Sequence, residues 1–176
     1  MISENFLNRI YHKIVSWEKL KTMRERWRAE KKTVVFTNGC FDLLHRGHVE
    51  YLARARELGD VLIVALNSDD SVRRLKGAER PILPQDDRAM ILAALQMVDA
   101  VTLFEQDTPY ELIREIVPDI LVKGGDYKPD QVVGKDIVEN AGGRVEIVPL
   151  VAGKSTSEVI ERIQSKGNLN REGSRE

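Results

Sequence analysis

Two histidines separated by two residues, His45 and His48, follow a short apolar run early in the chain. The run Val34–Phe36 predicts a buried strand, because β-branched and aromatic side chains fit a pleated, covered surface. Gly47 lies between the histidines, and the apolar spacing from Val49 onward predicts a helix that begins beside them. The start of a helix presents unpaired backbone N–H groups and the positive end of the helix dipole, and two imidazoles add donors for the same anion. The segment therefore predicts a phosphate-binding site.

A zinc site is the main chemical alternative for the histidine pair. His12 is the only other histidine of the chain, Cys40 is its only cysteine, and Cys40, Asp42 and the two site histidines do not match the ligand spacing of structural zinc sites. Packing or capping would explain a single histidine, but a pair around a glycine after a first strand favours function. We therefore expect no metal ligands here. We expect Cys40 to pack against the strand rather than to act as a nucleophile.

Several segments of the chain, including the histidine motif, resemble one enzyme family. The stretch from Gly39 to His48 is similar to the signature of the cytidylyltransferase-like nucleotidyltransferases, in which a glycine precedes the second histidine. Within that family, the chain most resembles the adenylyltransferases that make ADP-heptose from heptose 1-phosphate. The narrower resemblance extends over residues 13–163 and rests on five segments: Thr37–Asp42, Asn67–Asp69, Arg73–Gly77, Val122–Pro129 and Ser155–Ser157.

This resemblance implies a reaction, a cofactor and partners. The enzyme would transfer AMP from ATP to a heptose 1-phosphate, releasing pyrophosphate and forming ADP-heptose for lipopolysaccharide-type surface sugars. Mg²⁺ would be carried with ATP, mostly by phosphate oxygens and water. Related transferases are usually homodimers, and we expect the sugar kinase of the pathway on a separate chain. Two alternatives stay open: a cytidylyl- or adenylyltransferase for glycerol phosphate, ethanolamine phosphate or FMN, and a non-catalytic nucleotide-binding module.

Length and composition restrict the class of protein. The 176 residues predict one domain with a sizeable core, and the net charge of −1 argues against a nucleic-acid binder. No run approaches the roughly 20 apolar residues that a membrane span needs, and the N-terminus lacks a signal-peptide pattern. A single cysteine gives no intrachain disulfide. We therefore expect a cytoplasmic protein that binds neither nucleic acid nor membrane.

Apolar periodicity predicts strands that alternate with helices from residue 33 onward, with Asn38 and Gly39 ending the first strand. This alternation predicts an α/β fold with a doubly wound, parallel, five-stranded sheet of Rossmann-like type. The expected strands are Val34–Thr37, Val61–Asn67, Val101–Phe104, Ile120–Val122 and Val145–Val148. The expected helices are Gly47–Leu58, Ser68–Leu75, Asp86–Gln96, Pro109–Val117, Asp136–Ala141 and Ser155–Gln164.

The chain divides into three parts by pattern. Residues 1–30 form an expected helical extension, in which Ser16 caps the second helix. Residues 31–165 form the expected nucleotidyltransferase domain, and residues 166–176 an expected disordered polar tail. We expect Trp17–Trp27 to pack on the sheet and Phe6–Ile14 to help form the homodimer.

Loops that follow four of the strands are expected to enclose one pocket, because ligands in such folds bind beyond the carboxyl ends of the strands. Transfer of AMP needs no general base near neutral pH, so the task is to position phosphates and to neutralise their charge. The expected catalytic residues are His45, His48, Lys76 and Lys123. The expected nucleotide-binding residues are Thr37, Asn38, Gly39, Phe41, Gly47, Gly124, Asp126, Ser155 and Thr156.

Three further residues, Asp42, Asn67 and Arg88, are expected to bind the acceptor substrate. Asp42 would either accept hydrogen bonds from sugar hydroxyls or cap the region of His45. The resemblance implies that Arg88 faces the substrate phosphate, whereas a solvated helix charge is the structural alternative. We expect the three other arginines of this part of the chain to be surface or loop charges: Arg73, Arg74 and Arg80.

Overall fold

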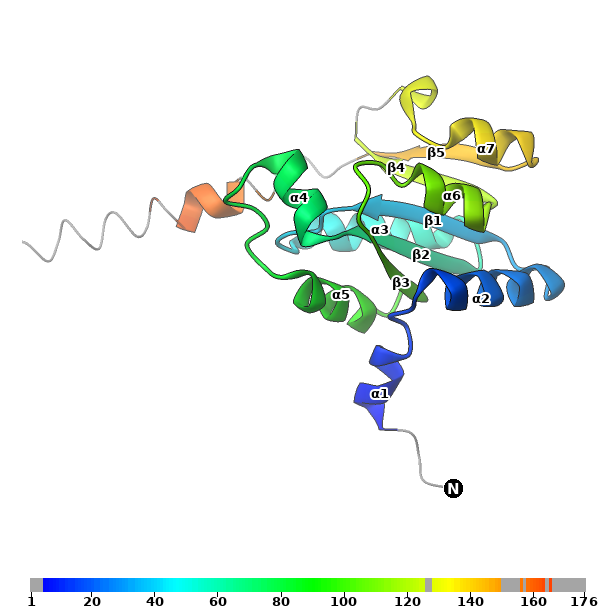
Figure 1. Cartoon of the computed structure of the whole chain (residues 1–176), viewed down its shortest axis with the longest axis horizontal. Coiled ribbons are helices and arrows are strands. Elements are labelled where there is room, and N and C mark those ends of the chain that lie inside the picture. The colour runs from blue at the N-terminus through cyan, green and yellow to red at the C-terminus, as the bar shows by residue number, and fades with distance from the viewer. Residues whose placement is uncertain (1–4, 126–127, 150–155, 157, 164, 166–176) are drawn as a thin grey trace, which may run out of the picture.

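A parallel sheet of five strands, in the order β3-β2-β1-β4-β5, forms the centre of the molecule (Figure 1). The computed structural model describes residues 5–125, 128–149, 156, 158–163 and 165. The strands are β1 (Val34–Gly39), β2 (Val61–Asn67), β3 (Ala100–Phe104), β4 (Ile120–Gly124) and β5 (Arg144–Val148). Every strand pair is parallel, which confirms the predicted doubly wound α/β fold.

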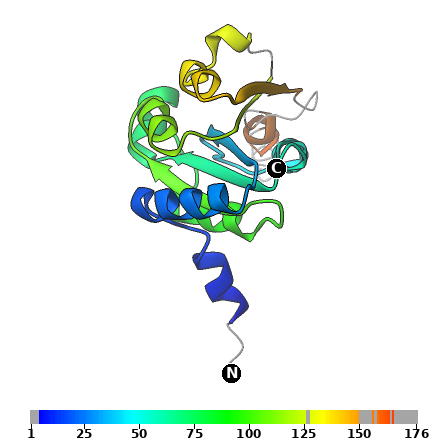
Figure 2. The same cartoon turned by 90° about the vertical axis from the view of Figure 1, so that its right-hand side faces the viewer.

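Helices cover both faces of this sheet (Figure 2). They are α1 (Phe6–Tyr11), α2 (Trp17–Ala29), α3 (Arg46–Glu57), α4 (Asp69–Lys76), α5 (Gln85–Ala94), α6 (Tyr110–Ile116) and α7 (Lys135–Asn140), with a 3-10 turn, η1, at Pro129–Gln131. Helices α2, α6 and α7 pack on one face, and α3 and α5 on the other. Both faces are therefore buried, as the unbroken apolarity of β2 predicts. Among the described residues, no helix is both long and apolar enough to cross a bilayer.

The chain reverses its direction of winding between β1 and β4. From β1 it proceeds through β2 to β3 on one side, and then returns to place β4 and β5 on the other side. Open α/β sheets form a crevice at such a switch point, just beyond the carboxyl ends of the two strands. A ligand site is therefore expected at the residues that follow β1 and β4.

Two strands, β1 and β4, continue two residues beyond the ends that the sequence pattern predicts. The expectation that Asn38 and Gly39 end the first strand is wrong, because they continue β1 and pair with Ala65 and Leu66 of β2. The ladder to a buried neighbouring strand outweighs the low strand propensity of these two residue types. Strand β4 likewise continues to Gly124. The extension carries the polar side chains to the edge of the sheet where the crevice forms.

The segment before α2 covers one edge of the sheet, that of β3. The backbone N–H of Val15 donates to the carbonyl of Val101 (2.9 Å), and the N–H of Val101 donates to the carbonyl of Lys13 (2.8 Å). The indole N–H of Trp17 donates to the carbonyl of Leu103 at 2.8 Å. Ser16 caps α2, as predicted, by accepting from the backbone N–H of Lys19. These contacts satisfy edge groups of β3 that would otherwise pair with another chain.

Candidate active site

A cavity of about 540 Å³ lies at the carboxyl ends of the strands, at the switch point between β1 and β4. Its lining comes from β1 and the loop after it, α3, the end of β2, α4, the segments before α5 and α6, β4 and η1. The C-terminal helical segment, described at residues 156, 158–163 and 165, also contributes. The lining residues are Asn38, Gly39, Cys40, Phe41, Asp42, His48, Asn67, Val72, Leu75, Lys76, Arg80, Asp107, Thr108, Pro109, Lys123, Gln131, Val132, Val133 and Thr156.

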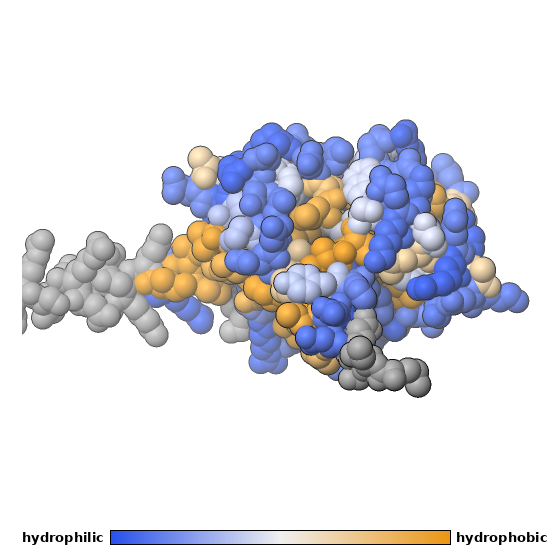
Figure 3. All heavy atoms as spheres, turned by 60° about the horizontal axis from the view of Figure 1, so that its bottom comes forward, coloured by the Kyte–Doolittle hydropathy of each residue, from blue (hydrophilic) through white to orange (hydrophobic). Residues whose placement is uncertain are grey.

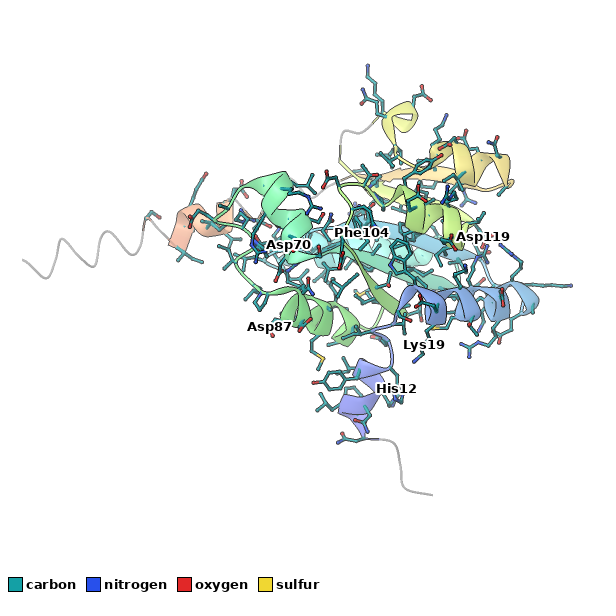
Figure 4. All side chains as sticks on the ribbon, in the orientation of Figure 1. His12, Lys19, Asp70, Asp87, Phe104 and Asp119 are labelled. Carbon is teal, nitrogen blue, oxygen red and sulfur yellow. The ribbon has the colours of Figure 1, made fainter. Side chains whose placement is uncertain are left out.

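A second cavity, of about 600 Å³, lies at the opposite end of the sheet and includes Arg24 and Asp119. Figure 4 shows how far apart the two ends are: Asp70 is on α4, beside the first cavity, and Asp119 lies just before β4 at the other end. We assign the chemistry to the first cavity, because His48 of the histidine motif lines it and it lies where ligands of this fold class bind. His45 is not part of the lining and contacts the cavity through the ring of His48.

The two histidines lie at the entrance of α3, as predicted. His45 is the residue before the helix, with extended backbone, and its ring stacks on that of His48 with 3.9 Å between the centroids. Burial, and to a smaller degree the neighbouring His45, lower the pKa of His48 to about 4. His48 is therefore neutral near pH 7. It can donate a hydrogen bond to a phosphate oxygen as a neutral imidazole.

The ring of Phe41 forms one wall of the cavity beside His48. Phe41 has a left-handed backbone (φ +44°), and its ring centroid lies 5.2 Å from that of His48. A Cβ atom on Gly39 would come within 3.0 Å of the Phe41 ring. Gly39 therefore makes room for a ring that folds back over the end of β1, and this ring buries one side of the His48 imidazole.

The side chain of Lys123 reaches from β4 to β1 at the switch point of the sheet. This residue ends β4 together with Gly124, and its ammonium group donates to the side-chain oxygen of Asn38 on β1. Burial lowers the pKa of Lys123 to about 8, so the side chain is mostly protonated at pH 7. Because the Lys123 ammonium is partly shielded from water, its attraction for a phosphate is strong.

The neighbouring Cys40 is no nucleophile at this site. Burial raises the pKa of its thiol, which keeps the thiol protonated and unreactive.

Three predicted nucleotide-binding residues lie outside the lining of the cavity. Thr37 is fully buried, and its hydroxyl lies 2.7 Å from that of Tyr51, which in turn donates to the carbonyl of Val122 (3.3 Å). Thr37 therefore fastens α3 to the sheet. Gly47 is buried in the first turn of α3, and Gly124 pairs with β5. Their contacts with nucleotide stay predictions.

Asp42 holds the segment that leads into α5. It is 3% exposed, and its carboxylate accepts hydrogen bonds from the Arg80 side chain and from the backbone N–H groups of Ile82 (2.6 Å) and Leu83 (3.3 Å). The alternative in which Asp42 caps the region of His45 is therefore wrong, and the contact of Asp42 with sugar hydroxyls stays a prediction. The chain places the backbone donors of residues 82 and 83 in its reach instead.

Arg88 is buried at the ends of two strands rather than solvated. It is 1% exposed, and its guanidinium donates to the carbonyls of Cys40 (2.6 Å), Asn67 (3.0 Å) and Leu83 (3.0 Å) and to the carboxylate of Asp69 (2.7 Å). The alternative of a solvated helix charge is therefore wrong. Arg88 joins the loops after β1 and β2, and direct contact with substrate stays a prediction.

Asn67 is also fixed within the protein. Its side-chain N–H donates to the Ser71 hydroxyl at 2.9 Å, and its remaining surface borders the cavity.

Arg80 is the site residue that the sequence analysis missed. It lines the cavity and pairs with Asp42, whereas Arg73 and Arg74 are half-exposed and pair with Asp70 and Asp107, as expected of surface charges. The partners Asp42 and Arg80 are 38 residues apart in the chain, so no local spacing could connect them.

Two further predicted residues lie at the rim. Lys76 is exposed at the end of α4 and lines the cavity, and Oγ1 of Thr156 lies 3.5 Å from the carbonyl oxygen of Leu43. The predictions for Asp126, Ser155 and Ser157 concern positions outside the described residues.

The donor set of the cavity suits phosphate better than a bare metal ion. Over the described part of the chain, no group of three or more His, Cys, Asp or Glu side chains could hold a metal. The two carboxylates of the lining, Asp42 and Asp107, pair with arginines. The other polar groups of the lining are mainly hydrogen-bond donors, which bind phosphate rather than a metal ion. This donor set fits a magnesium ion that is bound by the phosphate groups of ATP.

Comparison with known proteins gives consistent matches. The family model described as cytidylyltransferase-like matches residues 36–162. The bifunctional protein HldE of Syntrophotalea carbinolica is 61% identical over 146 residues, covering 83% of this chain and 30% of that protein. The protein of the same name from Trichlorobacter lovleyi is 59% identical over 151 residues, covering 86% of this chain and 31% of that protein. The chain thus spans about 30% of the length of these relatives.

Solved structures agree with the fold. The lipopolysaccharide core biosynthesis protein from Thermoplasma volcanium is 30% identical, with a TM-score of 0.57 over 68% of this chain and 97% of that one. The pantoate-beta-alanine ligase from Francisella tularensis has a TM-score of 0.56 at 15% identity, covering 82% of this chain and 68% of that one. The second likeness concerns the fold alone.

Proposed function

The chain belongs to the cytidylyltransferase-like family, and we propose that it transfers AMP from ATP to a heptose 1-phosphate, giving ADP-heptose and pyrophosphate. The observation that carries the proposal is that His48, stacked on His45, and Lys123 line the same cavity at the switch point of the sheet, in a chain 61% identical to a bifunctional protein HldE. The sugar follows from the sequence resemblance to ADP-heptose-forming enzymes.

The proposed reaction requires that the two substrates be positioned, and it requires no proton transfer. A phosphate oxygen of the sugar phosphate attacks the α-phosphorus of ATP and forms a new P–O bond. The bond from the α-phosphorus to the bridging oxygen breaks, and its electron pair leaves with pyrophosphate. The attacking oxygen is already an anion near neutral pH, so donors and cations have to neutralise charge that moves toward the leaving group.

Different residues of the site can neutralise different parts of this charge. The entrance of α3 supplies backbone N–H groups, and His45 and His48 add imidazole donors for the α- and β-phosphates. Lys123 places a partly buried cation on the opposite side of the switch point. Lys76, exposed at the rim, can move to the phosphates. Magnesium bound to the triphosphate would further lower its negative charge, held mainly by phosphate oxygens and water.

We propose a homodimer as the assembled state, with α1 near its interface. Phe6, Leu7 and Tyr11 are 71%, 48% and 53% exposed. Figure 3, which brings the side of α1 forward, shows hydrophobic side chains gathered between hydrophilic ones. A second copy that covers them would remove apolar area from water. A cytoplasmic location and a sugar kinase that supplies the acceptor complete the proposal.

A pyrophosphate-release assay tests the proposed reaction. ATP or CTP is combined with heptose 1-phosphate, glycerol phosphate, ethanolamine phosphate or FMN, each with Mg²⁺. We expect the highest kcat/KM for ATP with heptose 1-phosphate. Comparable efficiency with CTP and glycerol phosphate would instead identify a cytidylyltransferase, and nucleotide binding without any release would identify a binding module.

A further inference from the structure

One arginine of the cavity is held by only one of its nitrogen atoms. Arg80 is 21% exposed and lies between α4 and α5. Its Nε donates to a carboxylate oxygen of Asp42. Within the described residues, its side chain has no other hydrogen bond or ion pair. The two terminal nitrogens of its guanidinium are therefore available to a ligand in the cavity that Arg80 lines.

The carboxylate that holds Arg80 is itself fixed. Asp42 is 3% exposed, and its second oxygen accepts from the backbone N–H groups of Ile82 and Leu83. A guanidinium is a rigid planar fork, so fixing the Nε edge also fixes the direction of the terminal edge. That free edge matches a phosphate group, which can accept two parallel hydrogen bonds from it.

The cavity contains two separate sets of donors. Lys123 and the histidines lie at the ends of β1 and β4 and at the start of α3, whereas Arg80 approaches from the segment between α4 and α5. A phosphoryl transfer in line needs the attacking and leaving groups on opposite sides of the reacting phosphorus, so one set of cations cannot hold both. Two anionic substrates therefore require two sets.

We infer that Arg80, oriented by Asp42, binds the phosphate group of the acceptor, while the histidines and Lys123 bind the triphosphate of ATP. This inference rests on the proposed function and adds a residue that selects phosphorylated acceptors. Arg80 is a binding residue in this scheme, and Asp42 is a positioning residue that acts through it.

Binding measurements separate this role from turnover. Calorimetry in the presence of an ATP analogue that cannot be cleaved between its α- and β-phosphates gives two Kd values for each protein, one for heptose 1-phosphate and one for unphosphorylated heptose. The proteins compared are wild type, Arg80→Ala and Arg80→Lys. We expect Arg80→Ala to weaken heptose 1-phosphate about tenfold or more, as loss of a charge-assisted pair predicts, and to leave the ATP analogue within about twofold. Arg80→Lys should recover part of the loss, because it keeps the charge but not the fork.

A matched control is Arg73→Ala, which removes a half-exposed arginine of α4 that pairs with Asp70. It should change neither Kd. Asp42→Asn keeps one oxygen for the backbone donors but loses the charge that orients Arg80. We expect it to raise the KM of heptose 1-phosphate with little change in the KM of ATP, a split that a general loss of structure would not produce.

The outcomes distinguish this inference from the proposed function. Unchanged affinity of Arg80→Ala for heptose 1-phosphate, or an equal loss for the ATP analogue, would overturn the role of Arg80. If wild type binds no heptose 1-phosphate but uses another phosphorylated acceptor, the proposed sugar is wrong, and the same comparison with that acceptor still decides the role of Arg80. If wild type binds no phosphorylated acceptor, both proposals are wrong.

Discussion

The stacked imidazoles of His45 and His48 are the residues on which the proposed chemistry depends most. We predict that His45→Ala and His48→Ala each lower kcat by about 10²–10³-fold, the loss typical of one donor aimed at developing charge. The rest of the fold should survive, since neither ring belongs to the apolar core clusters. Steady-state kinetics with a melting curve for each variant checks this, and His12→Ala, next to α1 in Figure 4, is the control. Near-normal kcat at unchanged Tm would exclude the catalytic assignment.

The ammonium group of Lys123 predicts a pH dependence. Burial lowers its pKa to about 8, so the free enzyme holds this cation below that pH and loses it above. The kcat/KM for ATP, which reports the free enzyme, should therefore fall as the pH rises through about 8. Lys123→Arg keeps the charge and should move this fall to higher pH, whereas Lys135→Arg on α7 should leave it in place. An alkaline limb that stays near 8 in Lys123→Arg would assign it to another group.

At the scale of elements, Arg88 connects α5 to the loops that follow β1 and β2. Arg88→Ala would leave three carbonyls and the Asp69 carboxylate without their buried donor. We predict a loss of about 3 kcal/mol or more in the free energy of unfolding, the cost of breaking a buried pair. Arg73→Ala, at the surface, should stay within about 0.5 kcal/mol. Urea unfolding measures both, and equal midpoints for the two variants would contradict the role of Arg88.

The elements themselves were largely predictable from local pattern. The run from Val61 to Asn67 was predicted with the bounds of β2, because continuous apolarity between turn residues is a strong local signal. The C-terminal end of β1 was not, since pairing of Asn38 and Gly39 with β2 depends on a neighbouring strand that the sequence does not display. Strand order, which places Lys123 beside Asn38, is likewise a property of the assembled sheet.

The same division holds for the site. The histidines were found because a strand, a glycine and a helix start are adjacent in the chain, and the local geometry of a helix entrance follows from that. Arg80 was missed and its hydrogen bond with Asp42 was not predicted, because the two residues are 38 positions apart in the chain. Local spacing in the sequence therefore predicts site residues that lie in one loop. It does not predict pairs of site residues that are distant in the chain.

At the scale of the whole molecule, the exposed apolar side chains of α1 predict self-association. Phe6→Asp with Leu7→Asp changes residues that bury little in the chain itself, so the fold should be unaffected. We expect sedimentation at low micromolar concentration to give the mass of a dimer for wild type and of a monomer for this variant. Ile163→Asp, which alters an exposed apolar residue of the C-terminal helical segment, is the control. A variant that remains dimeric would place the interface elsewhere.

The most direct test of the proposed reaction follows the oxygen atoms. Heptose 1-phosphate labelled with ¹⁸O in its non-bridging phosphate oxygens is incubated with ATP, Mg²⁺ and the protein, and the products are analysed by mass spectrometry. Attack of the sugar phosphate on the α-phosphorus predicts ADP-heptose that retains all of the label and pyrophosphate that contains none. Label in pyrophosphate, or absence of an ADP-sugar while ATP is consumed, would contradict the assignment of this chain as an adenylyltransferase.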